Sequence, residues 1–325
     1  MKKIAVAAGL ITNERGEYLF AQRPRGKAHE GLWEFPGGKI EAGENAAAAL
    51  ARELKEELDL DLMSSAPHAV YTHVYAQEEL ALTLTVLRVT EWRGVPLGLE
   101  GQAHRWVSPA RMHRLQMPAA DRPIALELGL PDTLLITPEP PPPSAGSGAR
   151  RFWLHALEQS LLSGHKLVLL RIKQSPLIEQ HAIAALARDI AKQHGAEILL
   201  QDDAELCERW RFGGVSLTSK ALVRRKKRQL PAELWLSASC HSPAELALAS
   251  AIGCDFATLS PVLATPSHPG TPSLGWPRVA EYLSAQTLPV FALGGLQAAD
   301  LGLAKAVGAW GIAGISAFWT ATKSD

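Results

Sequence analysis

The sequence predicts an α/β protein in two parts, an N-terminal domain with a mixed sheet and a C-terminal (β/α)8 barrel. Two observations support this prediction. The first third of the chain alternates strand and turn signals around one acidic, alanine-rich helix. The remainder alternates short apolar runs with helical stretches, as parallel βα units do. At 325 residues the chain is long enough for two domains with substantial cores.

Composition argues against several classes of function. There are 33 basic and 33 acidic residues, so the net charge does not favour binding to nucleic acid or to a membrane surface. The three cysteines have neither paired nor metal-ligand spacing, as expected in a reducing compartment. No apolar run approaches the ~20 residues that span a bilayer, and the N-terminus does not resemble a signal peptide. We expect a soluble, cytoplasmic protein that binds neither membranes nor nucleic acid directly.

The first domain is organised around residues 37–60, where a glycine-rich turn leads into an acidic helix. The run 46–58 has high helix propensity, and Asn45 is its expected N-cap. One arc of this helix is apolar and is expected to be buried; it comprises Ala47, Leu50, Ala51, Leu54 and Leu58.

Glu53, Glu56 and Glu57 fall on a neighbouring arc of the same helix. Three carboxylates at this spacing repel one another unless a cation lies among them. An acidic helical face is in general more often simply solvated, but here a glycine turn precedes it. Hard carboxylate oxygens suit Mg²⁺ or Mn²⁺ far better than zinc. The sequence therefore predicts a Mg²⁺ site, with Mn²⁺ as the alternative ion.

The other elements of the first domain follow from local signals. Apolar runs at 4–11 and 18–21 flank a polar turn, which predicts a hairpin. After the acidic helix we expect strands at 69–74, 80–89 and 105–107, and a second helix at 123–128. These elements form a mixed sheet with a helix on each side.

The pattern Gly38, five residues, Glu44, seven residues, Arg52-Glu53-Leu54-x-Glu56-Glu57 resembles the signature of the Nudix hydrolases. These enzymes cleave nucleoside diphosphates linked to another group. Asp59 stands where the signature has a glycine, so we expect a changed helix end but intact chemistry. The segments WEFPGGKIEAGE, EWRGVPLGLEGQ and MPAADRPIALEL are similar to the MutT branch, the oxidised-purine triphosphatases, across residues 1–129. The resemblance implies an α/β/α sandwich.

The same resemblance implies a metal site and a hydrolytic mechanism. The ligands that it implies are a carbonyl of the glycine turn, helix glutamates and a loop glutamate: Gly37, Glu53, Glu56, Glu57 and Glu100. Divalent ions neutralise the phosphates and lower the pKa of a bound water. Glu53 or Glu44 is expected to act as general base, and Arg52 to orient the carboxylates. In this branch water attacks the β-phosphorus, releasing pyrophosphate and a nucleoside monophosphate.

Base recognition is expected to involve Arg23 and Phe35, with Lys39 near the phosphates. Asp121 stands where the MutT branch has a base-reading asparagine. An ionised aspartate only accepts hydrogen bonds and would repel a purine O6. We therefore expect Asp121 to be protonated in a dry pocket or to pair differently. The resemblance implies hydrolysis of 8-oxo-dGTP to 8-oxo-dGMP and pyrophosphate, which sanitises the nucleotide pool.

The second domain is expected to begin before the proline run 139–143, which by itself resembles a linker. The apolar stretch 133–137 precedes the prolines and predicts a buried strand, so we divide the chain into domains 1–129 and 131–325. Seven further apolar runs, separated by helical stretches, complete eight βα units: 167–172, 197–200, 214–217, 234–237, 256–259, 289–293 and 311–315.

Segments such as LVLLRIK, ILLQDDAEL, LPVFALGGL and AWGIAGISAFW resemble thiamine phosphate synthase and the thiazole tautomerase TenI, over most of 133–319. The resemblance implies a phosphate or thiazole-phosphate site made of Arg171, Lys173, Asp202, Ser239, Gly294, Gly295 and Ser316. The chain departs from the synthase pattern at Leu169, Gln201 and His268, and its second metal-binding aspartate is replaced within 217–221. These departures predict loss of synthase activity.

The one dense basic run, 224–228, is expected to decorate an exposed helix after the fourth barrel strand. Three functions remain open. The first is a Mg²⁺-dependent pyrophosphohydrolase of oxidised nucleotides with a degenerate barrel. The second is a thiamine-pathway enzyme whose first domain hydrolyses a pyrimidine or thiamine diphosphate. In the third, the barrel is a non-catalytic ligand sensor or scaffold. MutT-like segments outside the signature favour the first.

Overall fold

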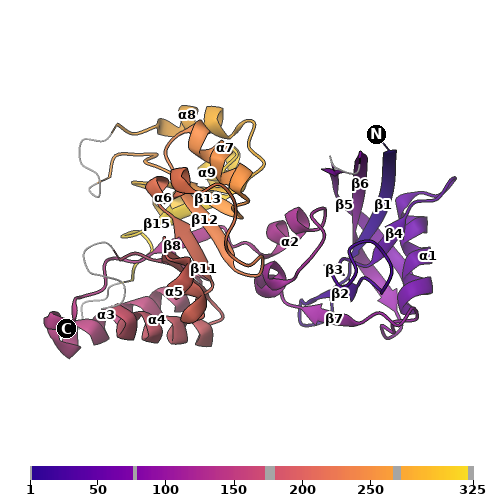
Figure 1. Cartoon of the computed structure of the whole chain (residues 1–325), viewed down its shortest axis with the longest axis horizontal. Helices are drawn as coiled ribbons and strands as arrows, with labels where there is room; N and C mark the ends of the chain where they lie inside the picture. Colours follow the sequence, from indigo (N-terminus) through magenta and orange to yellow (C-terminus); the bar gives the residue numbers. More distant parts are fainter. Residues whose placement is uncertain (1, 76–78, 173–179, 266–271, 321–325) are drawn as a thin grey trace. The chain divides into compact units, whose positions relative to one another are not determined.

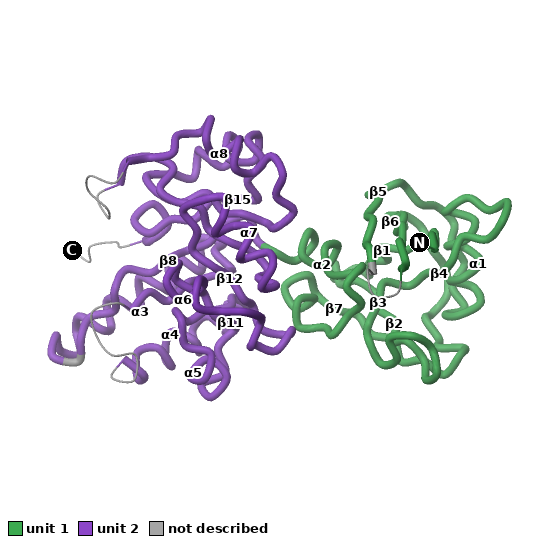
Figure 2. The backbone as a smooth tube through the Cα atoms, turned by 45° about the horizontal axis from the view of Figure 1, so that its top comes forward, with its two compact units in different colours: residues 1–130 green, residues 131–325 purple. Residues whose placement is uncertain are grey.

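The computed structural model describes residues 2–75, 79–172, 180–265 and 272–320 (Figure 1). The chain divides into two compact units, Met1–Leu130 and Pro131–Asp325 (Figure 2). Within the described ranges, no helix combines the length and apolar composition that crossing a membrane requires.

Unit 1 has the predicted α/β fold with a mixed sheet, and a second, smaller sheet beside it. The mixed sheet has the order β4-β1-β6-β5, with β1 parallel to β6 and antiparallel to β4. The smaller sheet, β3-β2-β7, is antiparallel. The strands are β1 Lys2–Leu10, β2 Tyr18–Gln22, β3 Trp33–Glu34, β4 Gly37–Lys39, β5 Asp61–Tyr75, β6 Leu80–Arg93 and β7 His104–Val107.

The predicted hairpin between the first two strands is confined to its turn. The antiparallel bridge of Thr12 with Tyr18 and the bond from the Leu19 N–H to the Ile11 carbonyl join them there, but β1 belongs to the mixed sheet and β2 to the smaller one. The helices are α1 Ala46–Leu58 and α2 Arg122–Gly129, with a 3-10 helix at Pro109–Arg114. Residues of α1 and α2 belong to different apolar clusters, which take alternate residues of β1 such as Ala7 and Ala8. The helices therefore cover opposite faces, as in an α/β/α sandwich.

The ends of α1 follow from single residues. Asn45 caps the helix by accepting the Ala48 N–H at 2.9 Å. Asp59 takes the C-cap position with φ 52°, in the left-handed region that aspartate tolerates better than most residues. It thus adopts the left-handed conformation that glycine favours at a helix end. The buried arc includes Ala49 instead of the predicted Ala47, which is exposed.

Unit 2 is a closed parallel barrel in which all eight predicted strands are present. They are β8 Thr133–Ile136, β9 Leu167–Leu170, β10 Glu197–Gln201, β11 Gly214–Leu217, β12 Trp235–Cys240, β13 Phe256–Leu259, β14 Val290–Leu293 and β15 Gly311–Gly314. The helices are α3 Gly146–Leu162, α4 His181–Gln193, α5 Ala204–Arg209, α6 Ser219–Arg224, α7 Pro243–Ile252, α8 Gly275–Leu283 and α9 Leu301–Ala306, with 3-10 turns at Pro143–Ala145 and Ala298–Asp300. Pairing of β15 with β8 closes the barrel.

The basic run 224–228 is only in part the solvated helical face that the sequence predicted, since Arg224, Lys226 and Lys227 are exposed. Helix α6 ends at Arg224, so most of the run lies beyond it. Arg228 donates to the Gly253 carbonyl at 2.7 Å and forms an ion pair with Asp255 at 3.2 Å. Asp255 is only 2% exposed, and a buried carboxylate needs such a partner. Arg228 therefore links two connecting segments of the barrel.

Candidate active site

Unit 1 contains a cavity of about 580 Å³ that brings together residues from several elements. The predicted site residues that line it are Arg23, Phe35, Gly37, Lys39, Glu53, Glu57 and Asp121. Apolar residues of β1 and β6 line it as well. Glu44, Arg52, Glu56 and Glu100 are not among its lining residues. The cavity thus joins the expected base-binding residues to two carboxylates of α1.

Two glycines allow the turn before α1 to pack closely. At Gly37, with φ 148°, a Cβ atom would lie 2.0 Å from the Ala7 carbonyl oxygen. At Gly38 it would lie 2.2 Å from the Cδ atom of Glu53. A side chain at either position would collide. Glycine is required here so that β4 can pair with β1 and the Glu53 carboxylate can lie against the turn.

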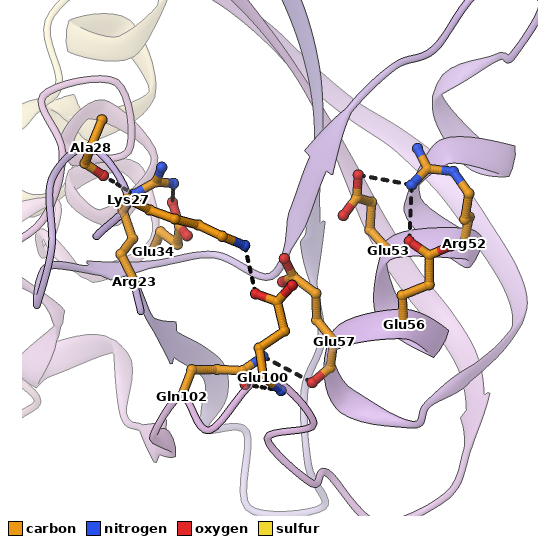
Figure 3. Close-up of polar contacts among 10 residues, drawn as sticks. All are labelled: Arg23, Lys27, Ala28, Glu34, Arg52, Glu53, Glu56, Glu57, Glu100 and Gln102. Carbon is orange, nitrogen blue, oxygen red and sulfur yellow. Dashed lines mark hydrogen bonds and ion pairs between the residues drawn. The ribbon is translucent and has the colours of Figure 1, made fainter. Parts of the chain in front are cut away.

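Arg52 forms hydrogen bonds with three glutamates of the candidate site. Its guanidinium binds both oxygens of Glu44, at 2.9 and 3.1 Å. It also donates to Glu53 at 3.0 Å and to Glu56 at 3.2 Å (Figure 3). A fifth hydrogen bond reaches the Lys39 carbonyl at 3.1 Å. The bond from Arg52 lowers the pKa of Glu44. Arg52 therefore ties the glycine turn to α1 and offsets carboxylate repulsion.

Glu57 and Glu100 form the other side of the acidic cluster. Burial, followed by the charges of Glu53 and Glu100, raises the pKa of Glu57 to about 7. Lys27 reaches Glu100 from the loop before β3, with Nζ 2.5 Å from a carboxylate oxygen (Figure 3). The hydrogen bond with Glu100 raises the pKa of Lys27. This lysine is a cation that the sequence alone did not place in the site.

In the part of the chain that the structure describes, no three His, Cys, Asp or Glu side chains form a ready-made metal cluster. Glu53 and Glu56 form ion pairs with Arg52, and Glu100 forms an ion pair with Lys27. The donor set nevertheless fits a hard divalent cation, because all of its side-chain donors are carboxylate oxygens. The charges of Glu53 and Glu100 also raise the pKa of Glu57, and a cation relieves that repulsion.

The opposite end of the cavity holds two acids, buried Asp121 and partly buried Glu34. Asp121 is 7% exposed and accepts the Phe35 N–H at 3.2 Å. Burial, and then the charge of Glu34, raises the pKa of Asp121 to about 7. Burial also raises the pKa of Glu34, which pairs with Arg23 at 2.5 Å (Figure 3). Arg23 also donates to the Ala28 carbonyl, so it shapes the wall of the cavity.

Three residues of the site were missed from sequence: Lys27, Glu34 and Gln102. Glu34 had a usable signal, since it is an acid between two aromatic residues just before the glycine turn. Lys27 and Gln102 had none, because their partners Glu100 and Glu57 lie 73 and 45 residues away in the chain. Such contacts exist only after folding.

The predicted barrel residues gather at one end of unit 2, where the carboxyl ends of the parallel strands meet. Arg171 follows β9, Ser239 lies in β12, and exposed Ser316 follows β15. Gly294 and Gly295 follow β14 with φ of 107° and 71°. Lys173 and His268 lie outside the described residues.

Asp202 follows β10 with φ 60°, and its carboxylate is already engaged. One oxygen accepts the Thr218 N–H at 2.6 Å, and the other accepts the Thr218 hydroxyl at 2.8 Å. Thr218 is also the N-cap of α6, since its hydroxyl accepts the Ala221 N–H. Thr218 lies in the segment where the second synthase aspartate was expected. Asp202 therefore supports a helix start in this chain.

Family models match both units. The model described as NUDIX domain matches residues 7–127, and the one described as thiamine monophosphate synthase matches residues 144–318. The 8-oxo-dGTP diphosphatase of Haemophilus influenzae is 37% identical over 120 residues, covering 37% of this chain and 87% of the relative. The CTP pyrophosphohydrolase of Escherichia coli is 36% identical over 124 residues, covering 38% and 90%. The thiamine-phosphate synthase of Gloeobacter violaceus is 32% identical over 169 residues, covering 52% and 50%.

Asp121 should make the stability of unit 1 depend on pH. Its pKa rises from 3.8 to about 7 on folding, so between these values the folded state binds more protons than the unfolded state. The free energy of unfolding should then fall as pH rises through this window, by at most about 1.4 kcal/mol per pH unit. Asp121→Asn keeps an acceptor for Phe35 and should flatten this dependence.

The measurement is urea unfolding between about pH 4 and 7, followed by amide exchange within unit 1. Glu14→Gln, which removes an exposed carboxyl group, is the matched control and should keep the wild-type slope. An unchanged slope in the Asp121 variant would show that this carboxyl group is ionised in the folded protein.

Proposed function

Since the chain belongs to the Nudix family through unit 1 and to the thiamine monophosphate synthase family through unit 2, we propose that it is a Mg²⁺-dependent 8-oxo-dGTP pyrophosphohydrolase. The products are 8-oxo-dGMP and pyrophosphate. The observation that carries the proposal is one cavity with α1 carboxylates at one end and buried Asp121 beside Phe35 at the other. A nucleotide has the same polarity, with phosphates at one end and a flat base at the other.

The phosphate end is the acidic cluster. Gly37, through its carbonyl, and Glu53, Glu56, Glu57 and Glu100 would hold the Mg²⁺. When bound, Mg²⁺ neutralises phosphate charge and lowers the pKa of a water ligand. Lys27 and Lys39 line the same cavity and supply cationic groups to the phosphates. Arg52 keeps the helix carboxylates in place beside the glycine turn.

Of the two candidate bases, Glu53 fits the role better than Glu44. Both oxygens of Glu44 are bound by Arg52, and one also accepts the Glu41 N–H at 3.0 Å. These bonds lower the pKa of Glu44, which weakens it as a base. Glu53 lines the cavity and has one bond from Arg52. In the proposed mechanism Glu53 takes the proton of the attacking water.

The base end distinguishes oxidised from ordinary guanine through hydrogen bonding. Guanine presents two acceptors, O6 and N7, along this edge. Oxidation at C8 places a hydrogen on N7 and turns it into a donor. A protonated Asp121 can donate to O6 and accept from N7–H, which matches the oxidised base alone. Its pKa of about 7 allows the protonated form near neutral pH.

The second candidate is a thiamine-pathway enzyme in which unit 1 hydrolyses a pyrimidine or thiamine diphosphate. The observation that favours it is the thiamine monophosphate synthase family membership of unit 2. The two candidates are separated by kcat/KM values for 8-oxo-dGTP, dGTP, CTP, hydroxymethylpyrimidine diphosphate and thiamine diphosphate. The best turnover with a thiamine-pathway diphosphate would replace the first proposal with the second.

Glu53→Gln and Glu57→Gln should each lower nucleotide turnover by at least ~10²-fold, because neutral amides cannot balance the charge of a divalent cation. Neither side chain belongs to the buried arc of α1, so the circular dichroism spectrum should not change. The measurement is steady-state hydrolysis at saturating Mg²⁺. Glu91→Gln, in an exposed position of β6, is the control. Wild-type turnover in both cavity variants would contradict metal-assisted hydrolysis here.

Asp121→Ala should reduce the preference for 8-oxo-dGTP over dGTP by roughly 1–3 kcal/mol, the cost of an unpaired buried polar group. Asp121→Asn should retain the preference, since an amide both donates and accepts. The measurement is the ratio of kcat/KM values for the two nucleotides in all three proteins across pH. If the alanine variant keeps the wild-type ratio, Asp121 does not contact the base.

Unit 2 should form no detectable thiamine phosphate from the pyrimidine diphosphate and the thiazole phosphate. The reason is that Thr218, which bonds both oxygens of Asp202, lies in the segment where the resemblance to the synthase places a second metal-binding aspartate, so that second carboxylate is missing. The measurement is product formation in the presence of Mg²⁺, with an active synthase as positive control. More than one turnover per protein molecule would contradict this prediction and establish a catalytic barrel.

A further inference from the structure

Gln102 connects two parts of the acidic cluster that are distant in sequence. Its Nε2 atom donates to the Glu57 carbonyl at 2.9 Å, and its Oε1 atom accepts the Glu100 N–H at 2.8 Å (Figure 3). Gln102 is 8% exposed and lines the cavity. A single side-chain amide therefore bridges the last turn of α1 and the loop that carries Glu100.

The backbone of the same loop attaches to the end of α1. The Leu99 N–H also donates to the Glu57 carbonyl, at 2.9 Å, and the Leu97 N–H donates to the Leu58 carbonyl at 3.0 Å. These carbonyls lack partners within the helix, as in the last turn of any helix. The side chains of Leu97 and Leu99 are exposed, so the attachment is made by the backbone.

The loop has little freedom once it is attached. A Cβ atom at Gly98 would lie 2.0 Å from the Gln102 carbonyl oxygen, so the two segments are in close contact. Gly101 continues the turn with φ 77° and donates its N–H to the Gly98 carbonyl at 3.1 Å. Glu100 therefore lies at the tip of a tight turn whose base is bound to α1.

We propose that Gln102 is a positioning residue for the divalent cation, because it sets the distance between the Glu100 loop and the helix turn that carries Glu57. The inference rests on the proposed function of unit 1. The two carboxylates repel each other, and Lys27 draws Glu100 toward its own loop with an ion pair of 2.5 Å. The Gln102 amide opposes both effects, since it holds the backbone of Glu100 and the carbonyl of Glu57 together.

The amide is the group required, because one end must donate and the other must accept. Gln102→Met keeps the length and the bulk of the side chain but removes both hydrogen bonds. Groups that orient metal ligands typically change metal affinity by about 10- to 100-fold when they are removed. Gln102→Met should therefore weaken Mn²⁺ binding by this factor, in the absence of any substrate.

The test is Mn²⁺ binding to the full chain, measured by electron paramagnetic resonance of the free ion. Only the Mn²⁺ ions whose binding is lost in the Glu57→Gln variant are counted as bound at the proposed site. The kcat at saturating metal should stay near wild type, while the metal concentration for half-maximal rate rises by the same factor as the dissociation constant. Gln116→Met, at an exposed position of unit 1, is the matched control and should bind Mn²⁺ like wild type.

A double-mutant cycle with Glu100→Gln separates positioning from general stabilisation. If Gln102 acts through Glu100, adding Gln102→Met to Glu100→Gln should weaken Mn²⁺ binding by less than about twofold. An equal loss in both backgrounds overturns the inference, as does a lower melting temperature with unchanged Mn²⁺ affinity. No Mn²⁺ binding to the wild-type chain overturns the proposed function, and this inference with it.

Discussion

Repulsion among carboxylates at one end of the cavity is the constraint on which unit 1 depends. It is visible in Glu57, whose pKa is raised to about 7 by burial and by its acidic neighbours. Arg52 offsets the repulsion on one side, and Lys27 does so on the other. The glycine at position 38 lets the Glu53 carboxylate lie close against the turn, because a Cβ atom there would meet it at 2.2 Å.

The cavity combines this charged end with a dry one. Asp121 and Glu34 are carboxyl groups whose pKa values are raised by burial, and Arg23 partners only one of them. A buried carboxyl group with a raised pKa is partly protonated near neutral pH, so it can donate or accept a hydrogen bond. A solvated carboxylate is ionised and only accepts. The asparagine-to-aspartate departure noted in the sequence is therefore compatible with base recognition, because tertiary burial changes the protonation of Asp121.

Unit 2 has the fold of the thiamine monophosphate synthase family, but its sequence departs from that family's pattern at several expected site residues. The barrel is closed, and glycines with positive φ follow β14 as a phosphate-binding turn would require. At the end of β10, Asp202 binds Thr218 and so supports the start of α6. Family membership therefore shows the architecture of this unit, and its function has to be argued from the site.

The sequence by itself determined the elements whose signals are local. The spacing of apolar residues and the Asn45 cap predicted α1, and eight apolar runs predicted the barrel strands. Spacing on one helix also brought the α1 glutamates together. Only the tertiary structure decided the separate sheets of unit 1, the ion pair of Arg228 with buried Asp255, the environment of Asp121 and the bridge from Gln102 to Glu57. The physical reason is that these features depend on contacts between residues far apart in the chain, where local periodicity and propensity carry no information.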